Sequence, residues 1–112
     1  MVREVKVNIL GEEYLVKVGK REEIKIGSEY DGLCYTFDKI LYIVEDKEDI
    51  KTAEGEVENL SEIIAHEVSH AYVYESGYSA SDDEEALVVW LSRNARKITN
   101  TVIEILDNLG II

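Results

Sequence analysis

The chain contains two histidines, and they lie four residues apart in the segment His66–His70, which reads HEVSH. In an α-helix, residues four apart lie one turn apart on the same face, so both imidazoles would project to one side. Two imidazoles placed in this way can bind one Zn²⁺ at about 2.0–2.1 Å from each nitrogen. Glu67 follows the first histidine, and its carboxylate would lie beside the metal, where it can take a proton from water. The segment therefore predicts a zinc site with an acid–base carboxylate, provided that it is helical.

The residues around this segment favour a helix. Asn59 lies three residues before Glu62, a spacing similar to that of an N-terminal capping box. Gly77 is of the residue type that commonly ends a helix. Between these signals an apolar stripe recurs at helical spacing: Leu60, Ile63, Ile64, Val68 and Ala71. We therefore expect a helix of about four turns that ends at Gly77.

A catalytic zinc ion usually has three protein ligands, and the sequence has no third histidine. Cys34 lies far upstream, and we expect it to be a small buried strand residue rather than a further ligand. The third ligand is therefore expected to be a carboxylate. Ser81 and Glu84 have the spacing of a capping box, which starts a second helix. A short turn, residues 75–80, would fold this helix back on the first and bring its first turn near His70.

Glu84 and Glu85 are both candidates for the third ligand. Glu84 is already occupied if the capping box forms, and an apolar run, Ala86–Leu91, starts directly after Glu85. We therefore favour Glu85. Acidic residues are also common in the first turn of a helix because they interact favourably with its dipole. For Glu84 and Glu85 this is the alternative to a role as zinc ligand.

Taken together, these residues resemble the gluzincin family of zinc peptidases. The segment His66–His70, a short turn and then Glu85 on a second helix look like a gluzincin. The small size is similar to that of the minimal archaeal and bacterial members called minigluzincins. The runs Tyr74–Gly77 and Trp90–Arg93, on either side of the acidic pair, are also similar to small phage and prophage metallopeptidases of the ImmA/IrrE kind. The resemblance covers roughly residues 34–98.

The resemblance implies zinc binding by His66, His70 and Glu85, with Glu67 as the general base in the hydrolysis of a peptide bond. It also implies a latent form, because minigluzincins are thought to keep their own C-terminal segment in the cleft. The sequence departs from larger gluzincins at Val89, where they carry a carboxylate that orients a histidine. Here another group, for example a backbone carbonyl, must orient the histidine.

The oxyanion of such a reaction also needs a donor, and no histidine remains for that role. Arg93 or one of four tyrosines could serve, and the sequence does not single one out: Tyr35, Tyr72, Tyr74 and Tyr78. A hypothesis from another class is a zinc-containing module without catalysis, which binds a partner protein through its acidic surface. The presence of Glu67 favours the enzyme.

The net charge of the chain limits which classes of molecule it can bind. The 112 residues carry a formal net charge of −12, which argues against nucleic acid or an anionic membrane as a partner. A peptide or protein substrate with basic or neutral segments fits this charge, and a homo-oligomer is compatible with it. No apolar stretch approaches the length of a membrane span, and the N-terminus lacks an apolar signal core. The single cysteine excludes an internal disulfide and suggests a cytoplasmic location.

The order of the expected elements predicts an α+β fold in one minimal zincin-like domain, residues 1–112. Alternation and turn residues predict strands over five segments: 2–10, 14–18, 23–26, 33–37 and 39–44. We expect the two helices to cover one face of this sheet. We expect Lys39–Val44 to be the edge strand nearest the metal, where a peptide could add as a further strand.

The second helix is expected to run from Asp82 to about Leu109. A core-facing stripe recurs along it: Leu87, Leu91, Ala95, Ile98, Val102, Ile105 and Leu109. Trp90 is expected to belong to the core. After Gly110 the chain ends in Ile111–Ile112, which we expect to pack on the sheet edge, on another copy of the chain or in the cleft.

Overall fold

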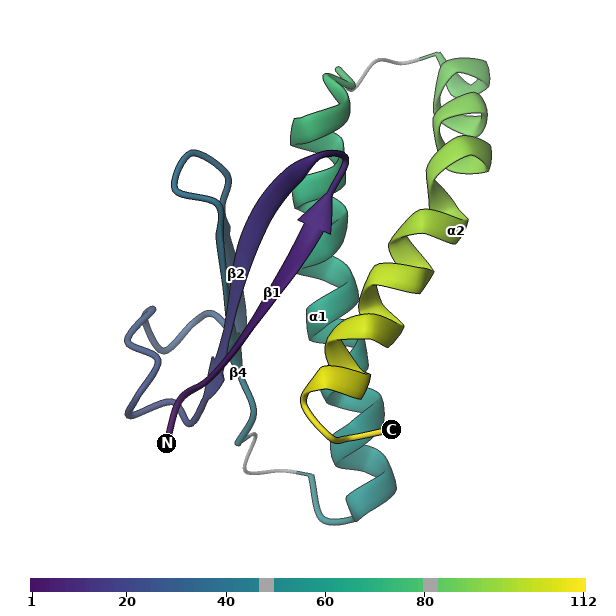
Figure 1. Ribbon diagram of the computed structural model, residues 1–112. Helices are drawn as coiled ribbons and strands as arrows, with labels where there is room; N and C mark the ends of the chain where they lie inside the picture. The colour runs from purple at the N-terminus through teal and green to yellow at the C-terminus, as the bar shows by residue number, and fades with distance from the viewer. Residues whose placement is uncertain (47–49, 80–82) are drawn as a thin grey trace.

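The computed structural model describes residues 1–46, 50–79 and 83–112. Four strands precede two long helices: β1 (Arg3–Ile9), β2 (Glu12–Gly19), β3 (Gly32–Tyr35), β4 (Ile40–Val44), α1 (Ala53–Ser76) and α2 (Glu84–Asn108). The two helices lie on the same side of the sheet (Figure 1). The α+β class is therefore confirmed. None of the described helices is long and apolar enough to cross a membrane.

The first two strands form the predicted hairpin. They pair antiparallel through a two-residue turn in which Leu10 and Gly11 both have positive φ, 52° and 92°. Such a turn matches the right-handed twist of the strands it joins. Side chains of β1 alternate, with Val5, Val7 and Ile9 buried toward the helices and their neighbours exposed or partly exposed.

The order of the sheet is β1-β2-β4-β3, and one of our expectations is wrong here. We expected Lys39–Val44 to be an edge strand, but β4 lies between β2 and β3. It pairs parallel with β2 and antiparallel with β3. The physical reason is its nearly continuous apolar sequence, ILYIV, of which Leu41, Ile43 and Val44 are fully buried. The edge strand beside α1 is β3.

Residues 23–26, which we expected to form a strand, lie in a series of turns instead. Arg21 organises this connection because its guanidinium donates to the carbonyl oxygens of Gly27 and Tyr30 and pairs with Asp31 at 2.7 Å. These contacts of Arg21 hold the loop backbone in successive turns. It therefore does not run alongside a neighbouring strand with which it could pair.

Helix α1 begins earlier than expected. Thr52 is its N-cap, and the Thr52 hydroxyl accepts a hydrogen bond from the amide of Gly55 at 3.0 Å. The helix ends as predicted at Gly77, which has φ 71°. Asn59 therefore lies inside the helix rather than at its start, because the charged residues after Thr52 already form the first turns.

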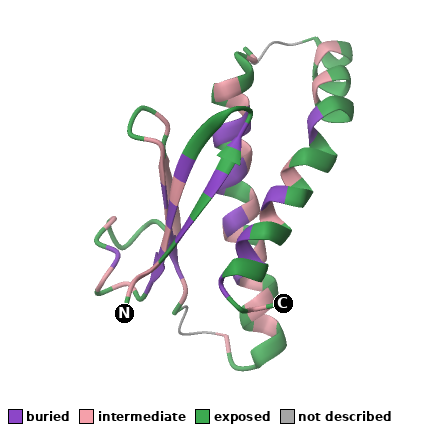
Figure 2. Cartoon of the chain, in the orientation of Figure 1, coloured by how far each residue is buried: buried purple, intermediate pink, exposed green. Residues whose placement is uncertain are grey.

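Helix α2 begins at Glu84 with Asp83 as its N-cap, whose carboxylate accepts from the amides of Glu85 and Ala86. The predicted cap Ser81 lies outside the described residues. Only the second half of the expected core stripe meets the core, with Ile105 and Leu109 buried and Ile98 and Val102 partly buried. Figures 1 and 2 show that the first half of α2 extends beyond the sheet, so Leu87 and Leu91 are exposed instead of facing the core.

The C-terminal residues pack on the domain. Leu109 is buried, Ile111 packs against the core, and Ile112 is exposed. The Arg3 guanidinium donates to the Leu109 carbonyl oxygen at 2.8 Å, which fixes the last turn of α2 beside β1.

A partly buried polar cluster joins the end of α1 to the sheet. The Glu75 carboxylate accepts hydrogen bonds from the Tyr14 hydroxyl and the Lys39 ammonium, both at 2.6 Å. Burial of Glu75 disfavours its charged form, but the hydrogen bonds from Lys39 and Tyr14 outweigh this, so that the pKa of Glu75 lies below its usual value.

This cluster predicts how stability depends on pH. Since the pKa of Glu75 is lower in the folded than in the unfolded chain, its contribution is present above the unfolded pKa and is lost as pH falls below it. We expect the free energy of unfolding to decrease between about pH 5 and pH 3. Glu75→Gln should flatten part of this decrease, as measured by urea unfolding across that range. An unchanged slope would show that the cluster does not contribute to it.

Candidate functional site

Helix α1 brings the two histidines together on its exposed side. The Nε2 atoms of His66 and His70 lie 3.2 Å apart, and the two rings meet edge to face with their centroids 4.8 Å apart. Two nitrogens that bind one tetrahedral zinc ion are separated by roughly 3.3 Å. The spacing therefore fits a shared metal ion. In the metal-free chain it also allows one imidazole to donate a hydrogen bond to the other.

Glu67 points away from solvent, toward the sheet. Its side chain is almost wholly enclosed, since the residue is only 6 % exposed. Within the described part of the chain it has neither a hydrogen bond nor an ion pair, and it lines the two hollows on either side of it. Burial raises the pKa of Glu67, although the nearby His66 and His70 act in the opposite direction. Titratable groups whose pKa is shifted by burial in a cleft are concentrated at functional sites.

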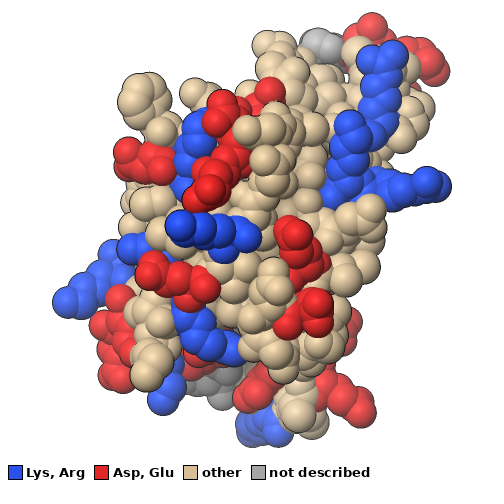
Figure 3. Space-filling model, viewed as in Figure 1, with Lys and Arg blue, Asp and Glu red and all other residues tan. Residues whose placement is uncertain are grey.

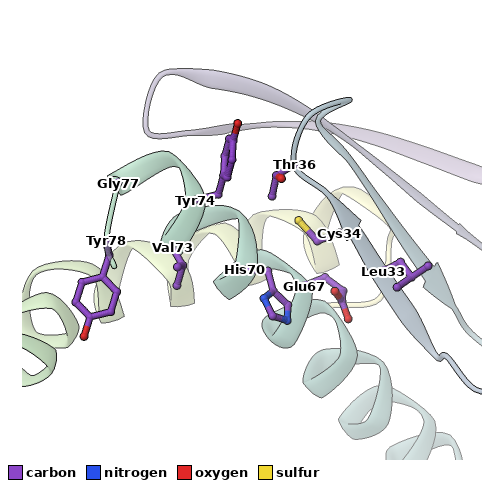
Figure 4. Close-up of a pocket in the computed structure, with 9 residues that line it drawn as sticks. All are labelled: Leu33, Cys34, Thr36, Glu67, His70, Val73, Tyr74, Gly77 and Tyr78. Carbon is purple, nitrogen blue, oxygen red and sulfur yellow. The ribbon is translucent and has the colours of Figure 1, made fainter. Parts of the chain in front are cut away.

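The two hollows follow the line where α1 meets β3. The first has a volume of about 490 Å³ and contains Glu67 and His70, with Leu33 and Cys34 of β3 as its other wall (Figure 4). The second has a volume of about 370 Å³ and contains His66 together with Glu67. Glu67 therefore lies where the two hollows meet, and we call the pair of hollows along the edge strand the groove.

Gly32 sets the distance between the strand and the helix. A Cβ atom at this position would lie 2.9 Å from Ile63 Cγ2 and 3.0 Å from both Cγ and Oε2 of Glu67. Only glycine allows so close an approach without displacing a neighbour. Two residues on, Cys34 faces the same side of β3, and its burial, with the negative charges of Glu67 and Glu75, raises its pKa to about 11. The thiol is therefore neutral at pH 7.

The structure does not bring Glu85 to the histidines. Over residues 1–46, 50–79 and 83–112, no three His, Cys, Asp or Glu side chains form a group that could hold a metal ion. We expected the first turn of the second helix beside His70, but this part of α2 meets the end of α1 instead, where the Trp90 indole donates to Ser76 Oγ at 2.8 Å. Glu85 lines the hollow beside Ser76 and Trp90 and neither of the two hollows that contain the histidines. Its role as a ligand, or that of Glu84, stays a sequence-based prediction.

The candidate oxyanion donors are separated by the fold. Tyr74 and Tyr78 line the same hollow as His70. Tyr72 is buried and hydrogen-bonded within the helix pair, and Tyr35 is exposed and packs on a neighbouring ring of the sheet. Arg93 lines a different hollow, beside α2. Of the five candidates, Tyr74 and Tyr78 are the two that share a hollow with the motif.

The hollows beside the histidines are lined by none of residues 109–112. Occupation of the cleft by the chain's own C-terminal segment, which the resemblance to minigluzincins implied, is therefore not seen in this structure. Trp90 packs against the core as expected, and its indole donates to Ser76 Oγ at 2.8 Å.

Comparison with known proteins finds no matching family model, no matching curated protein and no matching solved structure. The resemblance to gluzincins therefore rests on the residues of the chain alone.

Sequence reasoning missed the part that β3 plays in the site. Gly32 and Cys34 form one wall of the groove, and neither was expected to do so. A usable signal was present, because a glycine at the start of a short strand often marks a close approach of two backbone segments.

The contact at Gly32 can be tested directly. Gly32→Ala should lower the free energy of unfolding by about 1–3 kcal/mol, because the added methyl group overlaps Ile63 and Glu67. Phe37→Ala, at an exposed position just after β3, should change it by less than about 0.5 kcal/mol. Urea unfolding of both variants gives the comparison, and equal stability of Gly32→Ala and the wild type would refute the close approach.

Proposed function

We propose that the chain is a zinc-dependent peptidase, in which Glu67 acts as the general base between two metal-binding histidines. The observation that carries this proposal is the pairing of two features on adjacent residues. The His66 and His70 nitrogens have the separation of two ligands of one metal ion, and beside them lies the largely buried Glu67, whose carboxylate has no hydrogen bond or ion pair with a described residue. A packed core histidine pair would explain neither feature, because both imidazoles are exposed.

The chemical types of the proposed ligands are those that zinc commonly binds. Imidazole nitrogen is a common ligand of Zn²⁺, and a bound zinc ion polarises the scissile carbonyl group as a Lewis acid. His66 and His70 would hold the ion, and we propose Glu85 as third ligand from its position in the sequence. In the structure, Glu85 lines neither of the hollows that contain the histidines, so binding through it requires α2 to lie differently in the metal-bound protein.

Glu67 is positioned to accept the proton of the attacking water and to pass it on. Its oxygens open onto both hollows, so that a water molecule entering from either side can reach them. Its raised pKa makes it a stronger base than an exposed glutamate, which favours removal of a proton from the attacking water. The same carboxyl group can then deliver the proton to the leaving amine. Tyr74 or Tyr78 is within the hollow to stabilise the oxyanion.

The substrate is proposed to lie along β3. This strand pairs with β4 on one side, and its other edge borders the groove. An extended peptide can add to such an edge through backbone hydrogen bonds. The hollow beside His66 also contains Glu29 and Glu62, so we expect a basic side chain of the peptide to be favoured there.

The metal assignment is tested by zinc analysis of purified protein. We expect about one zinc ion per chain, with stoichiometric binding lost in His66→Ala and in His70→Ala because each variant removes a ligand. Glu67→Gln should retain zinc and lose hydrolysis of a peptide library, because the amide keeps the shape but cannot accept a proton. Full zinc content in both histidine variants would refute the site.

The third ligand is tested separately. Glu85→Gln should weaken zinc binding by roughly 10-fold or more, because a charged ligand is lost. Glu84→Gln is the matched control and should leave the affinity unchanged. If only Glu84→Gln loses zinc, the ligand is one residue earlier. A wild-type protein that holds zinc but digests no peptide would favour the non-catalytic binding module.

A further inference from the structure

The hollow beside His66 is acidic, and we call it the acidic hollow. In addition to Glu67, three carboxylates and no lysine or arginine line it; the three are Glu29, Asp31 and Glu62. Asp31 pairs with Arg21 at 2.7 Å, but Glu29 and Glu62 form no ion pair with a residue that the structure describes. On the face shown in Figure 3, by contrast, acidic and basic side chains are interspersed over the sheet. The acidic hollow is therefore suited to a cationic side chain.

Glu67 gives separate evidence that a ligand enters the acidic hollow. Its side chain is enclosed, with the residue only 6 % exposed, and its carboxylate has no hydrogen bond or ion pair with a described residue. Its Oε2 atom faces Gly32, a lining residue of the acidic hollow, since a Cβ atom on Gly32 would lie 3.0 Å from it. An enclosed polar group with no partner from its own chain indicates that a group from outside completes the site.

The hollow beside His70 differs in character, and we call it the apolar hollow. Its walls include Val73 and the rings of Tyr74 and Tyr78 (Figure 4). Apart from Glu67, which both hollows share, no acidic residue lines it. Pockets lined in this way commonly receive apolar or aromatic groups.

The free edge of β3 determines the direction of a bound peptide. The Asp31 carbonyl oxygen accepts a hydrogen bond from the Val44 N–H at 2.9 Å, and bonded pairs alternate along an antiparallel ladder. The backbone groups of Gly32 and Cys34 therefore point away from β4, where a further strand can pair with them. Antiparallel pairing is the more stable kind, and β3 runs from the acidic hollow toward the apolar one. An antiparallel peptide would enter the acidic hollow with its C-terminal side.

We propose that the groove selects two consecutive residues of an extended peptide: an apolar or aromatic residue in the apolar hollow, then lysine or arginine in the acidic hollow. Arg21 bonds to carbonyl oxygens on either side of Glu29 in the sequence, which holds this wall in place before a peptide binds. Because Glu67 lies where the hollows meet, the bond on the amino side of the basic residue is the one exposed to it. Only this position of cleavage rests on the proposed peptidase function.

The binding order is tested without catalysis, on isotope-labelled Glu67→Gln protein, which lacks the proposed base. The probe is the peptide Ala-Ala-Phe-Lys-Ala-Ala with a nitroxide at one end or the other. A nitroxide at the carboxyl end should broaden the amide signal of Asn59, in the acidic hollow, more than that of Tyr78, in the apolar hollow. A nitroxide at the amino end should do the reverse. The opposite pattern, or no broadening of either signal, would overturn the proposal.

The choice of a basic residue is tested by the ratio of two affinities, measured in the same Glu67→Gln background. The probes are this peptide and one with leucine in place of lysine, and the ratio cancels any change in the stability of a variant. Glu29→Gln and Glu62→Gln should each lower the preference for lysine by roughly twofold or more. Glu58→Gln is the matched control, because Glu58 lies one turn before Glu62 and lines neither hollow. An unchanged ratio in both hollow variants, or an equal decrease in Glu58→Gln, would overturn the proposal.

The position of cleavage is tested on the wild-type protein with zinc and a peptide library. We expect lysine and arginine to predominate at the new amino ends of the products. A basic residue at the new carboxyl ends, or no preference, would overturn the inferred order. A wild type that cuts nothing, while Glu67→Gln binds the peptides as expected, would refute the peptidase and support the binding order.

Discussion

The close contact between β3 and α1 is the constraint on which the candidate site depends. Because Gly32 has no side chain, the strand lies directly on Glu67 and removes water from one side of its carboxylate. The other sides remain open to the groove. The HEVSH segment by itself specifies only that three polar side chains lie on a helix. The spacing between strand and helix encloses one of them, Glu67, and this burial raises its pKa.

The far end of the same helix is held by a second anchor. Glu75 bonds to Tyr14 of β2 and to Lys39 in the turn between β3 and β4, so two parts of the sheet meet α1 there. The motif therefore lies between two fixed points on one helix. This arrangement limits rotation of α1 about its own axis, which keeps the imidazoles facing outward while Glu67 faces the sheet.

The features that the sequence predicted correctly are those set by local patterns. The β1–β2 hairpin follows from alternation and a turn glycine, and the end of α1 follows from Gly77. The interior position of β4 depends on parallel pairing with a strand some twenty residues away, which no local pattern records. Periodicity likewise shows which side of α2 is apolar, but not how much of its length meets the sheet. The exposure of Leu87 and the separation of Glu85 from the histidine hollows both depend on how α2 lies against α1, where Tyr72 contacts Thr101 and Trp90 contacts Ser76.

The bond from Arg3 to the Leu109 carbonyl oxygen joins residues 106 positions apart. The buried face of the first strand, with Val5 and Ile9, is completed in part by Ile105 and Leu106 near the end of the last helix. During synthesis the N-terminal hairpin therefore leaves the ribosome long before the helix that covers it. Contacts of such long sequence separation form slowly and late. The hairpin must wait with its apolar face uncovered, and the native domain can assemble only after α2 has been synthesised.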